Sequence, residues 1–391
     1  MRKTSLVLLL FLSVIQVYSQ WQWLYPQPQG NILRDFTFID SGETGFAVGD
    51  FGTIMKSTDT GAGWDFIDDV TTTHLRSVYF FNEDLGYVTG DSGLIIRYDG
   101  AWTEMSTPTF YQLRDIDFFS ESFGIAVGYK GLILKMSDGE WNEVSSGTLA
   151  TLNAIAVIDE QKALAVGDEG KVLTTNDAGT TWSGVNSGTN DPLFDVFFPS
   201  ADVGFIVGNQ GLMLKSNDGG ASWTDITSPF VEDDLYGIWF RDDQSGSICG
   251  ANGTLVSTVN GGENWSLHYH NSGYTFFDVF ARGLNPPDSG ICDTVTVCGI
   301  NGAIINDYRG DSCYMDAEFL SGNYGSLNSM LFHDTVAWAV GGDPFNNVPL
   351  ILTSKDGLTW REDTVEGITE YVSDIVFAND TLGYMSGYNG M

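Results

Sequence analysis

Three arginines recur at one position of a repeated segment. Arg34, Arg76 and Arg114 each follow a leucine, in Leu-Arg-Asp, Leu-Arg-Ser and Leu-Arg-Asp. A guanidinium group binds carboxylates and peptide oxygens through paired hydrogen bonds, so an arc of three predicts a carboxylate or peptide-backbone site. In later copies the same position holds Asn153, Phe194 and Tyr236.

The arginines also have a second interpretation. Asp50, Asp91 and Asp168 lie in neighbouring turns of the repeat, and the arginines would neutralise them. In the binding interpretation, Asp50 and Asp91 belong to the surface of the site, together with Tyr129 and Lys130 from the third turn. The residues alone leave both interpretations open.

The elements that would position these side chains come from an internal repeat. A glycine that ends the second strand-like segment recurs every 38 to 49 residues, at Gly49, Gly90, Gly128, Gly167, Gly208, Gly250, Gly299, Gly341 and Gly387. A period near 42 that holds four strand-length segments is typical of propeller blades. The sequence therefore predicts an all-β propeller of four-stranded antiparallel blades, seven or more in number. Seven copies could close one ring and the rest begin a second, or eight or nine could close together.

Each copy of the repeat contains two characteristic turns between its strands. In the second copy, strands a, b and c are expected at residues 75–81, 85–90 and 93–98, and strand d begins at Trp102. Strands b and c are joined by a GxxG turn such as GDFG or GANG, and left-handed turn positions suit Gly, Asn and Asp. Antiparallel order places these turns and the d–a connections on one rim, here called the GxxG rim. The c–d turns lie on the opposite rim.

The c–d turns fit the Asp-box pattern SxDxGxxW. The four near-complete matches are Ser57, Asp59, Gly61 and Trp64; Thr175, Asp177, Gly179 and Trp182; Ser216, Asp218, Gly220 and Trp223; and Thr258, Asn260, Gly262 and Trp265. We expect the aspartate to accept backbone N–H groups, the glycine to be left-handed and the tryptophan to pack between blades. A catalytic or calcium-binding role for these aspartates is the alternative.

The full repeat, strand a followed by GxxVGxxGxIxxSxDGGxxW, resembles the photosystem II stability/assembly factor family from about residue 21 to the end. This family is a branch of the Asp-box (bacterial neuraminidase repeat) propellers. The resemblance implies a non-enzymatic propeller, seven-bladed in photosynthetic members, that binds a partner protein during membrane-complex assembly through an arginine-rich face. Many relatives are exported proteins of bacteria without photosystems, so the resemblance supports membership of the family more strongly than it supports a photosynthetic role.

We therefore expect an exported, non-enzymatic scaffold or assembly factor that binds a protein or peptide on the GxxG rim. The alternative is an Asp-box glycoside hydrolase, sialidase-like or xyloglucanase-like, or a carbohydrate-binding propeller, with a glycan as partner. A hydrolase needs two carboxylates across a cleft, and no such pair stands out by position. HExxH, CxxC, P-loop and GxSxG motifs do not occur in the sequence, which predicts neither metal nor cofactor.

The amino-acid composition excludes some classes of binding partner. The 391 residues include 51 acidic and 17 basic side chains, for a net charge of −34. Such a charge argues against binding to nucleic acid or anionic lipid. The 47 glycines indicate a turn-rich folded chain.

The ends of the chain carry separate predictions. Residues 1–19 resemble a signal peptide, with Arg2 and Lys3 before an apolar run, which predicts a secreted, periplasmic or cell-surface protein. No later segment is long and apolar enough to span a membrane. Residues 20–320 would form blades 1–7, with an N-terminal closing strand near Trp21 and Trp23. Residues 321–391 would add further repeats, of which the last is incomplete.

The four cysteines divide into two pairs. Cys249 and Cys298 replace the valine before the repeated glycine, so they should be buried thiols. Cys292 and Cys313 fall on the Asp-box rim within one copy, and an oxidising compartment favours a disulfide between them.

Overall fold

The computed structural model describes residues 31–39, 42–61, 63–269, 275–282, 293–300, 304–309, 318–321, 326–333, 336–343, 348–354, 361–362, 372–379 and 382–387. The chain divides into two compact units, Pro28–Tyr324 and one that contains Gly325–Met391. Within the described residues, no helix has the length and apolar character needed to cross a membrane.

The first unit consists of four-stranded antiparallel sheets, each built from consecutive strands. The first three are β1 (Leu33–Ile39), β2 (Thr44–Gly49), β3 (Ile54–Ser57) and β4 (Asp65–Phe66); β5 (Leu75–Asn82), β6 (Leu85–Gly90), β7 (Ile95–Tyr98) and β8 (Trp102–Met105); and β9 (Leu113–Ser120), β10 (Phe123–Gly128), β11 (Ile133–Ser137) and β12 (Glu140–Val144). The next two are β13 (Leu152–Val157), β14 (Ala163–Gly167), β15 (Lys171–Thr175) and β16 (Ser183–Val185); and β17 (Leu193–Phe197), β18 (Gly204–Gly208), β19 (Met213–Ser216) and β20 (Thr224–Asp225). The remaining sheets are β21 (Leu235–Phe240), β22 (Gly246–Gly250), β23 (Leu255–Thr258) and β24 (Ser266–Tyr269); and β25 (Phe276–Arg282), β26 (Asp293–Gly299), β27 (Ile304–Arg309) and β28 (Glu318–Ser321).

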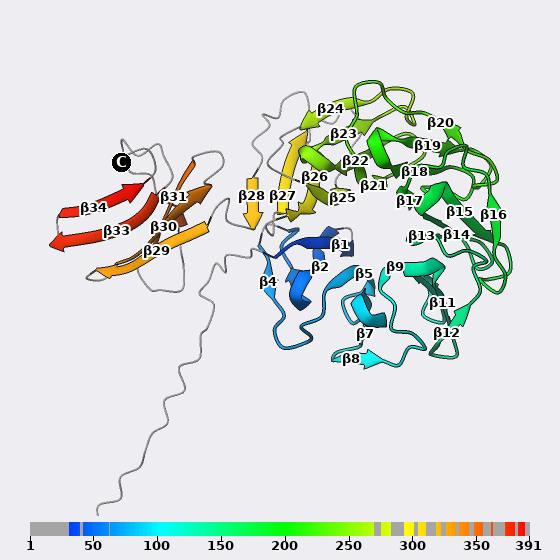
Figure 1. Cartoon of the computed structure of the whole chain (residues 1–391), viewed down its shortest axis with the longest axis horizontal. Coiled ribbons are helices and arrows are strands. Elements are labelled where there is room, and N and C mark those ends of the chain that lie inside the picture. Colours follow the sequence, from blue (N-terminus) through cyan, green and yellow to red (C-terminus); the bar gives the residue numbers. More distant parts are fainter. Residues whose placement is uncertain are drawn as a thin grey trace, which may run out of the picture. The chain divides into compact units, whose positions relative to one another are not determined.

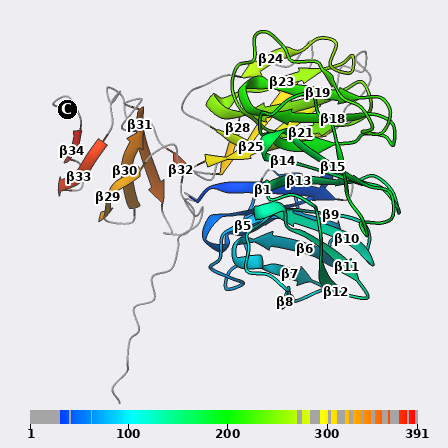
Figure 2. The ribbon, with the colours of Figure 1, turned by 45° about the vertical axis from the view of Figure 1, so that its right-hand side comes forward.

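These sheets follow one another around a ring, with β1, β5, β9, β13, β17, β21 and β25 innermost (Figure 1). The turned view in Figure 2 shows outer strands such as β8 and β12 at the edge of the ring. β1 contacts β25 and β26, so the first sheet lies beside the sheet β25–β28. At this junction Phe38 stacks on Phe280 with ring centroids 5.1 Å apart, and the buried Cys298 packs into the core of the first blade.

Apolar side chains between neighbouring blades form the core. Phe46 of β2 stacks on Phe80 of β5 at 3.6 Å, and Phe205 of β18 stacks on Phe240 of β21 at 3.8 Å. A four-stranded blade has two apolar faces and buries both only by packing against its neighbours. The predicted all-β propeller of four-stranded antiparallel blades is confirmed.

The second unit is also all-β. Its sheets are β29 (Ser326–His333), β30 (Val336–Asp343), β31 (Val348–Ser354) and β32 (Arg361–Glu362), and the pair β33 (Val372–Asn379) and β34 (Leu382–Gly387). Several predictions fall outside the described residues: the signal peptide, the closing strand near Trp21 and Trp23, and the disulfide between Cys292 and Cys313. Cys249 and Cys298 are free and buried, as their place in the repeat predicts.

The GxxG turns are short 3-10 turns: η2 (Asp50–Gly52), η3 (Asp91–Gly93), η4 (Tyr129–Gly131), η5 (Asp168–Gly170), η6 (Asn209–Gly211) and η7 (Ala251–Gly253). The middle residue of each is left-handed, with φ between 51° and 61°. We expected Gly, Asn or Asp at such positions, which holds for Asn252 but is wrong for Phe51, Ser92, Lys130, Glu169 and Gln210. These side chains point away from the fold, so the turn tolerates them at a modest steric cost.

The Asp boxes hold their turns together by local hydrogen bonds. In the fifth blade, Gly220 N donates to Ser216 Oγ at 2.8 Å and Ser222 N donates to Asp218 Oδ1 at 2.9 Å. Gly220 is left-handed, with φ of 84°. Hydrogen bonds from Ser222 lower the pKa of Asp218 to about 2. The other three boxes repeat this pattern at Asp59, Asp177 and Asn260.

Candidate binding site at the mouth of the central tunnel

A β-bulge begins every inner strand of the ring. In β1, for example, Leu33 pairs with Gly49 and Asp35 with Val48, so Arg34 is left out of the ladder. A bulge re-aims the extra residue, and here it repeats once per blade. The bulged residues, which we call the collar, are Arg34, Arg76, Arg114, Asn153, Phe194, Tyr236 and Phe277.

The collar surrounds one cavity of about 410 Å³, which all seven of its residues line. One half is cationic and the other is aromatic: the rings of Phe194 and Tyr236 lie 5.2 Å apart, and those of Tyr236 and Phe277 lie 5.5 Å apart. The two halves meet where the Arg34 guanidinium lies 4.9 Å from the centre of the Phe277 ring. Sequence analysis identified the arginines but missed Phe277 and the continuity of the aromatic half. The signal was present, because Phe277 follows the first residue of strand a in its copy.

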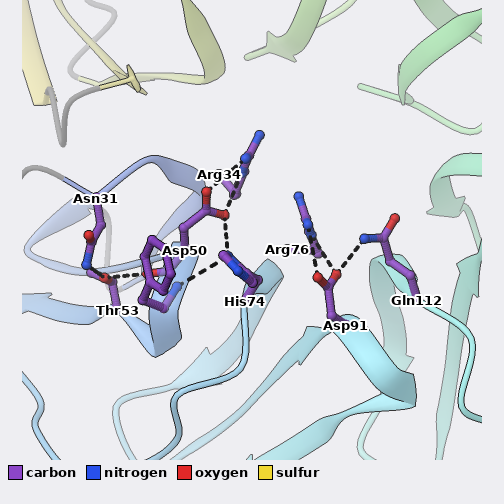
Figure 3. Close-up of polar contacts among 9 residues, drawn as sticks. Asn31, Arg34, Asp50, Thr53, His74, Arg76, Asp91 and Gln112 are labelled. Carbon is purple, nitrogen blue, oxygen red and sulfur yellow. Dashed lines mark hydrogen bonds and ion pairs between the residues drawn. The ribbon is translucent and has the colours of Figure 1, made fainter.

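Arg34 is held by Asp50 from the adjacent GxxG turn (Figure 3). Its Nε and Nη2 donate to the two carboxylate oxygens at 3.1 and 3.0 Å, and His74 Nδ1 lies 3.1 Å from the same carboxylate. Burial alone would raise the pKa of Asp50, but the hydrogen bonds and charge of Arg34 outweigh it and hold that pKa below its usual range. Asp50 therefore fixes the Arg34 side chain.

Arg76 repeats this arrangement in the next blade. Its Nε and Nη2 donate to the carboxylate of Asp91 at 3.0 and 3.2 Å, and Gln112 Nε2 also donates to Asp91 (Figure 3). Burial raises the pKa of Asp91, but the hydrogen bonds from Arg76 and Gln112 bring it below its usual range. The charge-neutralising interpretation is thus correct for Arg34 and Arg76.

Arg114 differs from both. Its own turn has Tyr129 where the earlier turns have aspartate, and Asp168 accepts a hydrogen bond from Asn153 at 3.0 Å instead. Within the described part of the chain, Arg114 makes no hydrogen bond or ion pair. Burial lowers the pKa of Arg114, and the charge of Arg76 acts in the same direction. Among the collar arginines, Arg114 is therefore the one with all of its donors available to a ligand.

The remaining predicted residues lie outside the collar cavity. Lys130 Nζ lies 5.0 Å from the centre of the Tyr111 ring and 5.7 Å from that of Tyr129, beside a separate groove on the rim. Asp50 and Asp91 orient the arginines and do not line the cavity. The structure therefore brings the arginines together and separates Tyr129 and Lys130 from them.

A tier of aspartates lies beneath the collar and joins neighbouring blades. Each accepts a backbone N–H from the inner strand of the next blade: Asp35 from Val78 at 2.7 Å, Asp115 from Ile155 at 2.8 Å, Asp195 from Ile238 at 2.9 Å and Asp278 from Phe36 at 3.3 Å. Asp117 makes the same bond to Val157 at 2.6 Å. Sequence analysis overlooked these residues, although Asp follows the bulged residue in four copies of the first unit.

Burial around the cavity favours the protonated form of these carboxyl groups. Burial, together with the charge of Asp278, raises the pKa of Asp35 well above its usual value. Burial raises the pKa of Asp115, Asp117 and Asp278 to about 7, and neighbouring carboxylates contribute. A carboxyl group that is removed from water resists ionisation, so these residues act as hydrogen-bonding cross-links between blades.

Substitution of Arg76 and of Arg114 should have different effects on stability. Arg76→Ala leaves Asp91 without its ion pair and should lower the free energy of unfolding by about 1 to 2 kcal/mol. Arg114→Ala removes no internal partner and should leave it unchanged within about 0.5 kcal/mol. Urea denaturation of both variants measures the difference. Equal losses would contradict the assignment of Arg114 as the unpaired arginine.

Comparison with known proteins agrees with this architecture. Residues 140–228 match the family model of the photosynthesis system II assembly factor YCF48. No curated protein matches the chain in sequence. A structure of YCF48 bound to D1 peptide is 19% identical, with a TM-score of 0.58 over 73% of this chain and 95% of that one. YCF48 from Cyanidioschyzon merolae is 15% identical, with a TM-score of 0.60 over 74% of this chain and 99% of that one.

A glycosidase structure shares the fold as well. The GH74 enzyme of Niastella koreensis is 13% identical, with a TM-score of 0.63 over 92% of this chain and 70% of that one. At these identities the structural matches show the fold alone. The resemblance to the assembly-factor family is confirmed, and residues 140–228 carry the repeat of the YCF48 group of BNR-type propellers.

Proposed function

We propose that this chain is a non-catalytic, seven-bladed propeller that binds a protein partner through a peptide seated at the collar. One observation carries the proposal: Arg114 presents an unpaired guanidinium at the mouth of a cavity, next to two arginines that are already oriented. A guanidinium with free donors at a cavity mouth suits a carboxylate or a peptide oxygen. The solved YCF48 structure with a bound D1 peptide supports a peptide ligand.

The seven-bladed ring is part of the proposal. The contact of β1 with β25 and β26 supports closure after the sheet β25–β28. The match of residues 140–228 to the family model of the assembly factor YCF48 supports a scaffold or assembly role. We also propose export to the periplasm, cell surface or medium, on the basis of residues 1–19. Cell fractionation with N-terminal sequencing of the mature protein tests this point.

Glycoside hydrolysis is the second candidate, and the tunnel aspartates do not favour it. Asp115 accepts backbone N–H groups from Ile116 and Ile155 as well as the Ser77 hydroxyl, and Asp195 accepts those of Val196 and Ile238. A general acid or nucleophile needs an oxygen free to reach the glycosidic bond. Turnover of a polysaccharide or sialoside panel that depends on one carboxylate would overturn the non-catalytic proposal.

The binding proposal is tested with peptides. A peptide array selects a binder, and calorimetry then compares its acid form with the C-terminal amide. Arg114→Gln should weaken binding about tenfold, because a charge-assisted hydrogen bond is lost. Lys130→Gln is the matched control, since Lys130 is a cation on the same rim outside the cavity, and it should change affinity less than twofold. Equal losses in both variants would contradict binding at the collar.

A further inference from the structure

We infer that the collar selects peptides that end in an aromatic residue, with the terminal carboxylate on Arg114 and the terminal side chain against the aromatic half. This inference rests on the proposed peptide-binding function and specifies its ligand. It follows from the division of the collar into two chemically distinct halves that line one cavity.

The aromatic half extends into the tunnel in two tiers. Phe194, Tyr236 and Phe277 form the upper tier. Three residues further along the same strands lie Phe197, Trp239 and Phe280, whose rings contact one another at 6.4 and 5.0 Å. All six line the cavity and are only partly buried, so their surfaces are available to a ligand.

The opposite wall carries the cations and several polar groups, although Phe36 and Phe38 of the first blade also line the cavity. Blades one to three contribute the collar arginines, and beneath them the wall holds Thr37, Ser77 and Asp115. A ligand that fills this cavity therefore meets a cation on one side and aromatic faces on the other. Aromatic rings prefer offset or edge-to-face contacts with other rings, so the wall of phenylalanine, tyrosine and tryptophan favours a planar side chain over a small aliphatic one.

The size of the cavity indicates the end of a chain. A volume of about 410 Å³ lies near the lower limit of ligand pockets, which run from roughly 300 to 1,000 Å³. The backbone of a strand that passed across the mouth would offer Arg114 only uncharged carbonyl oxygens, whereas a chain end offers a carboxylate with a full negative charge. On a protein of net charge −34, that negative charge is bound only where local cations offset the general repulsion.

Four peptides of one sequence that differ only at the last residue test the inference: phenylalanine acid, phenylalanine amide, alanine acid and alanine amide. Fluorescence anisotropy should rank the phenylalanine acid about tenfold tighter than either the alanine acid or the phenylalanine amide. Equal affinity for the phenylalanine and alanine acids would overturn the inference and leave the proposed function standing. Failure of all four to bind would overturn both.

Substitutions distinguish the contributions of the cationic half and the aromatic half of the collar to peptide binding. Tyr236→Ser should abolish the preference for phenylalanine over alanine and keep the preference for acid over amide. Arg114→Gln should abolish the preference for acid over amide and keep the preference for phenylalanine. Tyr236→Phe retains the ring and should restore the wild-type ranking, which also guards against a folding defect in the serine variant. Phe110→Ser is the matched control, because Phe110 is 92% exposed on the same rim and does not line the cavity. A loss of phenylalanine preference in Phe110→Ser would contradict the inference.

Discussion

Replacing Gly167 with alanine should lower the free energy of unfolding by about 3 kcal/mol or more. Gly167 ends β14 beside the chain that enters β13, and an added Cβ would lie 2.0 Å from the carbonyl oxygen of Thr151 and 2.9 Å from the Cα of Leu152. Backbone cannot rotate away as a side chain can, so the connection itself would have to move. Urea denaturation of the purified protein measures the loss.

The same close approach explains why this glycine recurs. At Gly49, Gly90 and Gly128 an added Cβ would also lie within 2.2 Å of the carbonyl oxygen that precedes the inner strand. That carbonyl accepts a hydrogen bond from the turn, as when Asp50 N donates to Ile32 at 2.8 Å. The repeated glycine thus sets the position of the bulge and, through it, of the collar.

Gly184→Ala is the matched control for Gly167→Ala. Gly184 lies in β16 of the same sheet, and an added Cβ would have no heavy atom within 4 Å. The control should be as stable as the wild-type protein or slightly more so, because alanine reduces the entropy of the unfolded chain. Similar losses in the two variants would show that the close approach of the backbone is not the cause.

Stability should fall as the pH rises from about 4 to about 7, by several kcal/mol in total. Burial raises the pKa of Asp115, Asp117 and Asp278 to about 7, whereas the unfolded chain titrates near the ordinary value of 3.8. Unfolding in this window releases protons, so the stabilisation is complete below pH 4 and is lost as the pH rises through the folded pKa of about 7. Denaturation midpoints measured at several pH values test the slope.

Repulsion among 51 acidic residues would produce a slope of the same sign, so a pair of isosteric variants separates the two causes. Asp115→Asn removes a tunnel carboxyl and should flatten the slope between pH 4 and 7. Glu104→Gln removes one charge from an exposed position on β8 and should leave the slope nearly unchanged. Equal flattening in both variants would assign the slope to surface repulsion instead.

The collar was only partly predictable for a physical reason. Spacing placed Arg34, Arg76 and Arg114 at equivalent positions, because each follows the first buried leucine of strand a. Whether an arginine forms an ion pair depends on which residue of the neighbouring turn it meets. Predicting that contact requires the geometry of the bulge, which aims the arginine side chain. Asp50 and Asp91 reach their arginines, whereas Tyr129 replaces that carboxylate for Arg114.

The sequence by itself determined the local structure of this protein. Its repeat encodes four-stranded blades, GxxG turns and Asp boxes, because these depend on residues that are close in the chain. The tertiary structure alone decided which side chains meet around the cavity: Asp278 accepts the N–H of Phe36, which is 242 residues away in the chain. The contact of β1 with β25 brings this pair together, and the arrangement of the blades places Arg114 and Tyr236 on the wall of one cavity.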